Sequence, residues 1–153
     1  MAVIDVYLSL GSNLGNRERN LKIALNFLEL TLGTHFTGIS SVRETEAVGF
    51  DGPAFLNLVV RYRTSRSPLS LLSICKRIEQ EMGRTDAPEY DDSGNRVYHD
   101  RVIDIDILLY GKQHINTQKL TIPHKALPER PFFQEMIDPS RLFVDLTISQ
   151  SLR

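Results

Sequence analysis

Alternation in one ten-residue segment limits the fold of this chain more than any other feature of its sequence. Over residues 101–110, every second position from Ile103 to Leu109 is a large aliphatic residue. Side chains two residues apart on a β-strand point to the same face of a sheet. The aliphatic face must therefore be covered by other elements, whereas the opposite face carries Asp104 and Asp106. The segment predicts a strand in a sheet that buries one of its two faces.

Strand-forming residues bounded by turn residues predict further strands. We expect them over residues 3–10, 35–45 and 55–62, and a short one over residues 118–122. The third of these also alternates, so that its aliphatic and aromatic residues share one face. The residues expected on that buried face are Leu56, Leu58, Val60 and Tyr62.

Two segments show the spacing and end signals of helices. The first is expected between an N-cap at Asn16 and a stop at Gly33, and the second between an N-cap at Ser67 and a stop at Gly83. In both, apolar residues recur at helical spacing and predict one packed side. These residues are Leu21, Leu25, Leu28 and Leu32 in the first helix and Leu69, Leu72, Ile78 and Met82 in the second.

The order of the main elements is strand, helix, strand, strand, helix, strand, which is the split βαβ pattern of a ferredoxin-like sheet. We therefore predict an α+β fold with a ferredoxin-like βαββαβ core, both helices on the apolar sheet face, and extra C-terminal elements. A chain of 153 residues is long enough for one domain with a core of its own. We expect a single domain over residues 1–153.

Composition and charge argue against several classes of partner. The formal net charge is −1, whereas proteins that bind a nucleic-acid backbone carry a clear basic excess. No apolar run approaches the ~20 residues of a membrane span, and the first residues lack the pattern of a signal peptide. Cys75 is the only cysteine, so the chain forms no internal disulfide. We expect a cytoplasmic monomer that binds neither nucleic acid nor membrane.

Asp104 and Asp106 are the sharpest chemical signal in the sequence. Their carboxylates project from one face of the predicted strand at adjacent positions, where like charges repel unless a cation lies between them. Mg²⁺ takes one or two carboxylates together with phosphate oxygens. The spacing is equally compatible with a solvated strand face that carries two acids, so the metal site and the plain polar face both stay open.

Phe55 and Asn57 lie two residues apart on the expected strand 55–62, on the face opposite its apolar residues. An aromatic ring and an amide at this spacing can stack on a flat heterocycle and hydrogen-bond to its edge. Taken alone, the pair more often represents a ring that covers the sheet beside an incidental asparagine, since single surface aromatics need no special explanation.

Basic residues in the second half of the chain are candidates for a polyphosphate clamp, because arginine presents a planar, permanently charged fork to phosphate. Only Arg101 is placed by position, three residues before Asp104; the others are equally compatible with ordinary surface charges, and His124 with a structural histidine. The glycine turn at residues 11–15 lies between a strand and a helix but lacks a complete phosphate-loop motif. The candidate residues are Arg84, Arg96, Arg101, Lys119, His124 and Arg130.

Short motifs follow one another along most of the chain in a fixed order. They are Leu10-Gly11-Ser12-Asn13-Leu14-Gly15, Thr45 with Gly49, Phe55-Leu56-Asn57, Arg77-Ile78-Glu79, Gly83-Arg84, residues 101–108, Leu120-Thr121-Ile122-Pro123-His124 and Arg130-Pro131-Phe132. Together they resemble the family of 6-hydroxymethyl-7,8-dihydropterin pyrophosphokinases of the folate pathway. The resemblance covers about residues 3–133. It implies a substrate pair of ATP and a reduced pterin.

The resemblance also implies roles for particular residues on the pterin side. The pterin ring is expected to stack between Phe55 and Phe132. Its edge is expected to hydrogen-bond to Asn57 and to the backbone around Thr45 and Val48.

For the diphosphate transfer, the resemblance implies two Mg²⁺ ions that bridge the ATP phosphates and are held by Asp104 and Asp106. Arg101 stands beside them as a further catalytic residue. The pterin hydroxymethyl oxygen attacks the β-phosphorus, and AMP leaves. The contacts with ATP that the resemblance implies fall on Lys76, Glu79, Arg84, Arg101, Lys119, Thr121, His124 and Arg130.

Residues 85–100 form a long polar stretch without apolar periodicity, and loops of this length in a small domain are usually functional or disordered. We expect this loop to be mobile without ligands and to close over ATP and pterin, with Arg96 and Tyr98 on its ligand side. The chain departs here from the family pattern. Asp100 replaces a frequent proline, and Asp86 replaces an arginine.

Two other classes of function compete with this interpretation. One is a non-catalytic ferredoxin-like module that binds a small molecule or RNA. An RNA-binding sheet would need exposed aromatics and a basic surface, whereas Asp104 and Asp106 repel phosphate without metal. The other is an ordinary phosphoryl or nucleotidyl transferase, which only the resemblance distinguishes from a diphosphate transferase.

Overall fold

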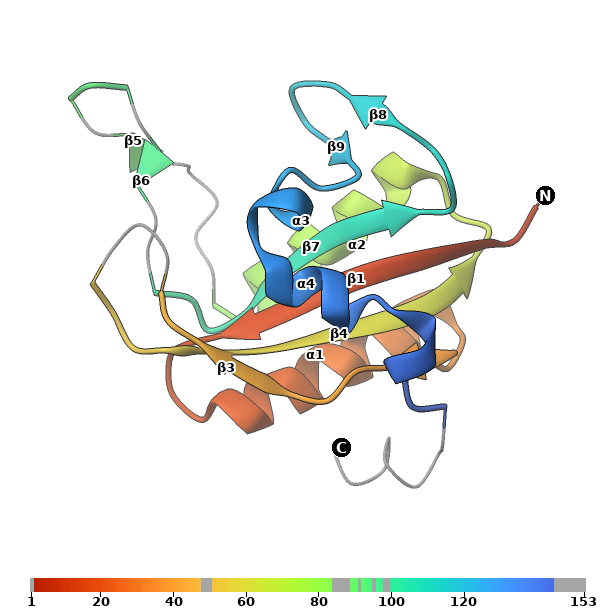
Figure 1. Ribbon diagram of the computed structural model, residues 1–153, viewed down its shortest axis with the longest axis horizontal. Helices are drawn as coiled ribbons and strands as arrows, with labels where there is room; N and C mark the ends of the chain where they lie inside the picture. The colour runs from red at the N-terminus through yellow and green to blue at the C-terminus, as the bar shows by residue number, and fades with distance from the viewer. Residues whose placement is uncertain are drawn as a thin grey trace.

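A five-stranded antiparallel sheet forms the centre of the computed structural model, which describes residues 2–47, 51–83, 89–90, 92–94, 96–97 and 100–144. In Figure 1, two long helices lie on one face of this sheet and two short C-terminal helices lie on the other. The strands of the sheet are β1 (Ile4–Ser12), β2 (Gly38–Ile39), β3 (Arg43–Thr45), β4 (Phe55–Thr64) and β7 (Asp104–Tyr110).

The strand order is β2-β4-β1-β7, and β3 also pairs with β4. All of these pairings are antiparallel. Counted along the chain as the second, third, first and fourth expected strands, this is the arrangement of a ferredoxin-like sheet. The predicted α+β fold class is therefore confirmed, with β1 at the centre and β7 at one edge.

The first helix, α1 (Arg17–Leu32), begins and ends where its end signals predict. The side chain of Asn16 accepts a hydrogen bond from the backbone N–H of Arg19, which satisfies one free donor of the first turn. Gly33 has φ 69° and stops the helix in the left-handed conformation that glycine adopts without strain. Its expected leucines are buried against the sheet, apart from Leu32, which is partly buried.

The second helix, α2 (Pro68–Glu81), starts as expected at Ser67, whose side chain accepts from the N–H of Ser70. Ile78 is buried and Leu72 and Met82 are partly buried against the core, as predicted, but Leu69 is 56% exposed. The buried stripe begins instead at Leu71, and a residue two positions earlier lies roughly 200° around the helix axis. The buried residues of α2 are Leu71, Ile74, Cys75, Ile78 and Glu79.

The main core lies between the two helices and the sheet. The four residues expected on the buried face of β4, from Leu56 to Tyr62, all belong to it. A second, smaller cluster lies on the other face, where Val59 and Leu108 contact the C-terminal helices. Those helices are α3 (Ala126–Glu129) and α4 (Pro131–Met136), followed by a 3-10 turn at Pro139–Arg141.

Strand β7 contains an irregularity that the alternating sequence does not reveal. Leu8 pairs with Ile107 and Tyr7 pairs with Leu109, so Leu108 is an extra residue on the β7 side. A bulge of this kind changes the phase of the alternation. The prediction that Leu109 shares the face of the core isoleucines is therefore wrong, and Leu109 packs in the second cluster.

The strand expected over residues 35–45 is divided into β2 and β3, which pair with the same edge of β4. At the break, the hydroxyl of Ser40 accepts a hydrogen bond from the N–H of Val59, at 2.8 Å. The backbone N–H of Ser40 also donates to the carbonyl of Val59, at 2.8 Å. The hydroxyl of Ser40 thus replaces a backbone acceptor, and this segment stays hydrogen-bonded to β4 where it is not a regular strand.

Short hairpins complete the described part of the chain. Within the loop expected over residues 85–100, the described residues include a two-stranded pair, β5 (Glu89–Tyr90) and β6 (Arg96–Val97), where we expected no regular structure. The proposed lid movement of this loop, and Tyr98 within it, lie outside the described residues. A second pair, β8 (Ile115–Asn116) and β9 (Thr121–Ile122), includes the end of the strand expected at residues 118–122.

Across the described residues, every helix is too short or too polar to cross a membrane.

The reactivity of the buried Cys75 thiol tests the packing of α2 against the sheet. Cys75 on α2 is fully buried, and burial raises the pKa of its thiol far above the ordinary value, with smaller contributions from the negative charges of Glu79 and Asp106. The thiolate is the reactive form of cysteine. We expect Cys75 in the native protein to react with an aromatic disulfide reagent at least about 100-fold more slowly than in denaturant. Rapid labelling of the native protein would contradict the packing of α2.

Candidate functional site

The face of the sheet opposite α1 and α2 carries a row of polar residues at one end. In the register of the sheet, Gly11 of β1 lies between Asn57 of β4 and Asp104 of β7. Residues directly opposite one another in an antiparallel pair share a face. Asn57 and Asp104, which are distant in sequence, are therefore brought to the same face on either side of a glycine.

Gly11 keeps the space between these two groups open. A Cβ atom at this position would stand 3.1 Å from the Oδ1 atom of Asn57 and 3.4 Å from the Cδ1 atom of Phe55. The first distance is tighter than ordinary Cβ contacts and the second is a normal van der Waals contact, so a larger residue would have to displace the amide of Asn57. The close approach of Asn57 therefore explains why residue 11 is a glycine, whereas the sequence alone indicated only a tight turn.

Asp104 and Asp106 are both half-buried on this face, as the alternation predicts. Asp106 lies one row along, opposite Ser9 of β1. Within the described residues, no group of three or more histidine, cysteine or acidic side chains is arranged to hold a metal ion. Two carboxylates on one strand face suit Mg²⁺, which completes its coordination with phosphate oxygens and water. These two residues could therefore hold Mg²⁺ that arrives with a polyphosphate.

His124 lies beside the acidic pair. Its Nε2 atom is 3.7 Å from the Oδ1 atom of Asp106, and its Nδ1 atom accepts a hydrogen bond from the N–H of Ala126 at 3.1 Å. Burial lowers the pKa of His124, an effect that the charge of Asp104 opposes. In the neutral ring with Nδ1 as acceptor, Nε2 carries the proton and presents it toward Asp106. One ring nitrogen of His124 can thus bond to the backbone, as in a structural histidine, while the other stays available to a polyphosphate.

The expected pterin residues of β3 and β4 lie together. The amide Nδ2 of Asn57 donates to the hydroxyl of Thr45 at 2.7 Å and to the carbonyl of Arg43 at 3.3 Å. Asn57 is only 8% exposed, so its amide is held in one orientation. Phe55 is half-buried and lies opposite Thr45 in the pairing of the two strands.

Phe132 comes from the C-terminal part of the chain. It is half-buried at the start of α4, where its ring centroid lies 4.5 Å from that of Phe133. It packs against the second core cluster, which includes Val59 of β4 and therefore lies on the outer face of the sheet. Figure 1 shows α4 in front of this face. Phe132 thus lies on the same side of the sheet as Phe55.

The residues expected to contact ATP lie in several places. Lys76, Lys119 and Thr121 are exposed, and Arg101 and Arg130 are half-buried. Arg84, like Val48 on the pterin side, lies outside the described residues.

Glu79 is placed differently from the other expected ATP contacts. It is 5% exposed on the packed side of α2, and its Oε2 atom accepts a hydrogen bond from the backbone N–H of Ile105 at 2.9 Å. It therefore approaches β7 from the helix side of the sheet.

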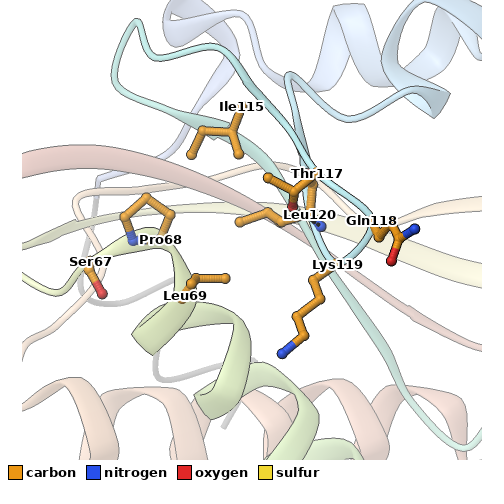
Figure 2. A pocket seen from close by; sticks show the side chains of 8 residues that line it. All are labelled: Ser67, Pro68, Leu69, Ile115, Thr117, Gln118, Lys119 and Leu120. Atoms are coloured by element: carbon orange, nitrogen blue, oxygen red, sulfur yellow. Dashed lines mark hydrogen bonds between the residues drawn. The ribbon is translucent and has the colours of Figure 1, made fainter.

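Lys119 lines a pocket of about 570 Å³ between the start of α2 and the β8–β9 hairpin (Figure 2). Leu69, the residue that was expected in the core, lines the same pocket. The walls are mainly apolar. The lining residues are Ser67, Pro68, Leu69, Ile115, Thr117, Gln118, Lys119 and Leu120.

Asn13 is a residue of the site that sequence reasoning included only as part of a motif. Its Nδ2 atom donates to the carbonyl of Pro53 at 3.0 Å and to Oδ1 of Asp100 at 2.9 Å. Its Oδ1 atom accepts from the N–H of Arg101 at 2.6 Å, and its own N–H donates to the Arg101 carbonyl at 3.0 Å. One buried side chain thus joins the turn after β1 to the loops that precede β4 and β7. The only sequence signal was an asparagine inside a turn cluster.

Fold and site together are those of a ferredoxin-like α+β enzyme with an acidic pair beside an amide and aromatic pair. A family model described as 7,8-dihydro-6-hydroxymethylpterin-pyrophosphokinase (HPPK) matches residues 7–138. The chain belongs to this family, which confirms the resemblance drawn from its motifs.

Named relatives agree with the family. The chain is 44% identical over 129 residues to the 2-amino-4-hydroxy-6-hydroxymethyldihydropteridine pyrophosphokinase of Porphyromonas gingivalis, covering 83% of this chain and 84% of the relative. It is 38% identical over 127 residues to the enzyme of the same name from Bacillus subtilis, covering 82% of this chain and 71% of the relative. A folate synthesis bifunctional protein of Arabidopsis thaliana is 44% identical over 129 residues, or 84% of this chain, which spans only 25% of that longer protein.

The hydrogen bonds of Asn13 lead to a stability prediction. The variant Asn13→Ala should lower the free energy of unfolding by about 2 kcal/mol, because it removes several hydrogen bonds and leaves buried backbone groups without a partner. Urea denaturation followed by circular dichroism measures this change. Asn26→Ala on the exposed side of α1 is the matched control and should change stability by no more than about 0.5 kcal/mol. An equal decrease in the free energy of unfolding in both variants would mean that the hydrogen bonds of Asn13 do not stabilise the fold.

Proposed function

We propose that this chain transfers the terminal diphosphate of ATP to the hydroxymethyl group of 6-hydroxymethyl-7,8-dihydropterin, with release of AMP, in folate synthesis. The observation that carries the proposal is the row of Asn57, Gly11 and Asp104 across three strands. The row supports the proposal because it brings an amide suited to a heterocycle edge and a carboxylate suited to Mg²⁺ to one face of the sheet. Membership of the pyrophosphokinase family supports the same reaction.

On the pterin side, Asn57 can act as an oriented acceptor. Its Nδ2 is engaged by Thr45 and Arg43, and its Oδ1 faces the space above Gly11. A carbonyl oxygen in this position accepts a hydrogen bond from an N–H donor on the edge of the ring. We propose that Phe55 and Phe132 cover the two faces of the ring, with the backbone near Thr45 and Val48 completing the contacts.

On the phosphate side, we propose that Asp104 and Asp106 hold two Mg²⁺ ions with ATP. When bound, Mg²⁺ neutralises charge on the polyphosphate and orients it. The backbone of Arg101, three residues before Asp104, is hydrogen-bonded to Asn13, which fixes the point from which the arginine side chain extends. The further ATP contacts that we propose are Lys76, Arg84, Lys119, Thr121, His124 and Arg130, whereas the buried Glu79 is not proposed to touch the nucleotide.

The reaction then needs close approach more than covalent chemistry by the protein. The hydroxymethyl oxygen forms a bond to the β-phosphorus, the bond from that phosphorus to the α-phosphate oxygen breaks, and the hydroxyl proton is lost. Holding both reactants on one sheet face lowers the entropic part of the barrier.

We also propose that the chain acts as a single-domain monomer in the cytoplasm, which size-exclusion chromatography and localisation of a tagged chain would test.

The products of one assay test this function. The protein is incubated with ATP, Mg²⁺ and the reduced hydroxymethylpterin, and the nucleotides are separated. AMP formed in equal amount to the pterin diphosphate supports the proposal. ADP would indicate a simple kinase, and no turnover with intact pterin binding would indicate a binding module.

The acidic pair generates the first activity prediction. Asp104→Asn and Asp106→Asn should each lower turnover at least about 100-fold, because removal of a metal ligand costs more than loss of the groups that support one. The fold should survive, since both side chains point away from the core. Steady-state rates and circular dichroism are measured together. Asp5→Asn, an acid of β1 with a side chain 55% exposed, is the control and should keep full activity.

The second activity prediction concerns ligand selectivity. Phe55→Ala should weaken pterin binding by about 1–3 kcal/mol, the value of stacking a base on an aromatic ring, and leave binding of an unreactive ATP analogue nearly unchanged. Calorimetry with each ligand measures both. Phe143→Ala is the control, because Phe143 is 43% exposed and is joined to Ile39 of β2 through its backbone. Equal losses for the two ligands in Phe55→Ala would assign the ring to the fold and not to the pterin.

A further inference from the structure

Glu79 is a buried acid whose position calls for an explanation. It is 5% exposed on the packed side of α2, and acidic side chains are almost never buried without a partner. Its Oε2 atom accepts a hydrogen bond from the backbone N–H of Ile105 at 2.9 Å. Bonds from an N–H group to a carboxylate are shorter and stronger than bonds between neutral groups. The helix is therefore joined to β7 by a strong polar contact inside the core.

The N–H group that donates to Glu79 belongs to the backbone between the two acidic residues of the site. Ile105 is 4% exposed and directs its own side chain into the core, while Asp104 and Asp106 on either side project to the opposite face. A hydrogen bond to the N–H of Ile105 restrains the peptide plane that connects Asp104 to Ile105. The positions of both neighbouring carboxylates depend on that backbone.

Strand β7 needs such a restraint because of its place in the sheet. It is the last strand in the order β2-β4-β1-β7, so β1 pairs with one side of it. An edge strand directs alternate N–H and carbonyl groups away from its only neighbour. Glu79 meets one of these groups, and the N–H of His124 donates to the carbonyl of Leu108 at 3.0 Å farther along the strand. The strand that carries the acidic pair is thereby held along its outer edge.

We infer that Glu79 is a positioning residue, which holds the Ile105 peptide so that Asp104 and Asp106 present their carboxylates together to a phosphate-bound divalent cation. The inference rests on the proposed function and assigns Glu79 a role on the helix side of the sheet, away from the nucleotide. Groups that orient metal ligands in this way typically contribute about 10–100-fold to metal affinity.

Two substitutions separate positioning from a role of the negative charge. Glu79→Gln keeps an oxygen that accepts from Ile105 and removes the charge, whereas Glu79→Ala removes both. Glu81→Ala, an exposed acid on the same helix, is the control. Amide hydrogen exchange of Ile105 is followed by NMR in the protein without ligands. Calorimetry measures the Mg²⁺ dependence of binding of an unreactive ATP analogue, and rates of AMP release complete the set.

We expect Glu79→Ala to exchange the Ile105 amide at least about 10-fold faster and to need about 10-fold more Mg²⁺ for half-maximal analogue binding and turnover. Glu79→Gln should stay within about 3-fold of the unmodified protein in each measurement, since a neutral hydrogen bond retains the geometry. Pterin affinity should be unchanged in both variants. If Glu79→Ala fails to fold, Glu79→Asp takes its place with the same expected changes, because its side chain keeps the charge but is one methylene too short to hold the Ile105 N–H in the same geometry.

Two results would overturn the inference. Equal losses of Mg²⁺-dependent binding in the Gln and Ala variants would show that the charge acts directly, as in a contact with the nucleotide complex. Unchanged Mg²⁺ dependence in Glu79→Ala, with faster exchange at Ile105, would show that the hydrogen bond serves stability alone. The unmodified protein is assayed first for AMP release, so a failure of the proposed function is seen separately from a failure of the role of Glu79.

Discussion

The pairing of β1 with both β4 and β7 is the constraint on which the rest of the molecule depends. As the central strand, β1 fixes which residue of β4 faces which residue of β7, and it places Asn57 and Asp104 in one row with Gly11. A shift of one residue on either side would turn every side chain of that strand to the opposite face. The buried residues Leu8 and Leu10 oppose such a shift, since both are fully enclosed in the main core. Packing on one face of the sheet thus determines the arrangement of chemistry on the other.

Strand pairing positions the backbone of the site, and buried polar contacts then orient its functional groups. Thr45 holds the amide of Asn57, Asn13 holds the backbone of Arg101, and Glu79 holds the peptide of Ile105. Each of these contacts joins segments that are far apart in the sequence. Buried hydrogen bonds of this kind add little net free energy but cost much when one partner is lost. They therefore select one geometry for a site that is built from several loops and strand ends.

The periodic parts of this fold were predictable from the sequence, whereas the irregular and long-range parts were not. Alternation in β4 and β7 and the end signals of α1 are local properties, so they could be interpreted without tertiary structure. The extra residue at Leu108 and the break at Ser40 depend on how two strands pair, and neither changes the alternation of apolar residues in the sequence. For the same reason, the sequence showed Asp104 and Asp106 as a pair without any indication that Gly11 lies between Asp104 and Asn57. The bond of Glu79 to Ile105 was equally hidden, because a buried acid on a helix resembles a surface acid in sequence.

The bulge at Leu108 divides the outer face of β7 into a polar region and a region that packs against other elements. Before it, the face carries the half-buried Asp106; after it, Leu108 and Leu109 pack in the cluster that includes the short C-terminal helices. Tyr110 returns to the main core beyond the bulge, and its hydroxyl donates to the carbonyl of Arg66. Substitutions in the C-terminal helices are therefore restricted by packing volume, and those in the polar region by the shape and charge of the ligands. One inserted residue lets a single strand meet both requirements without mixing them.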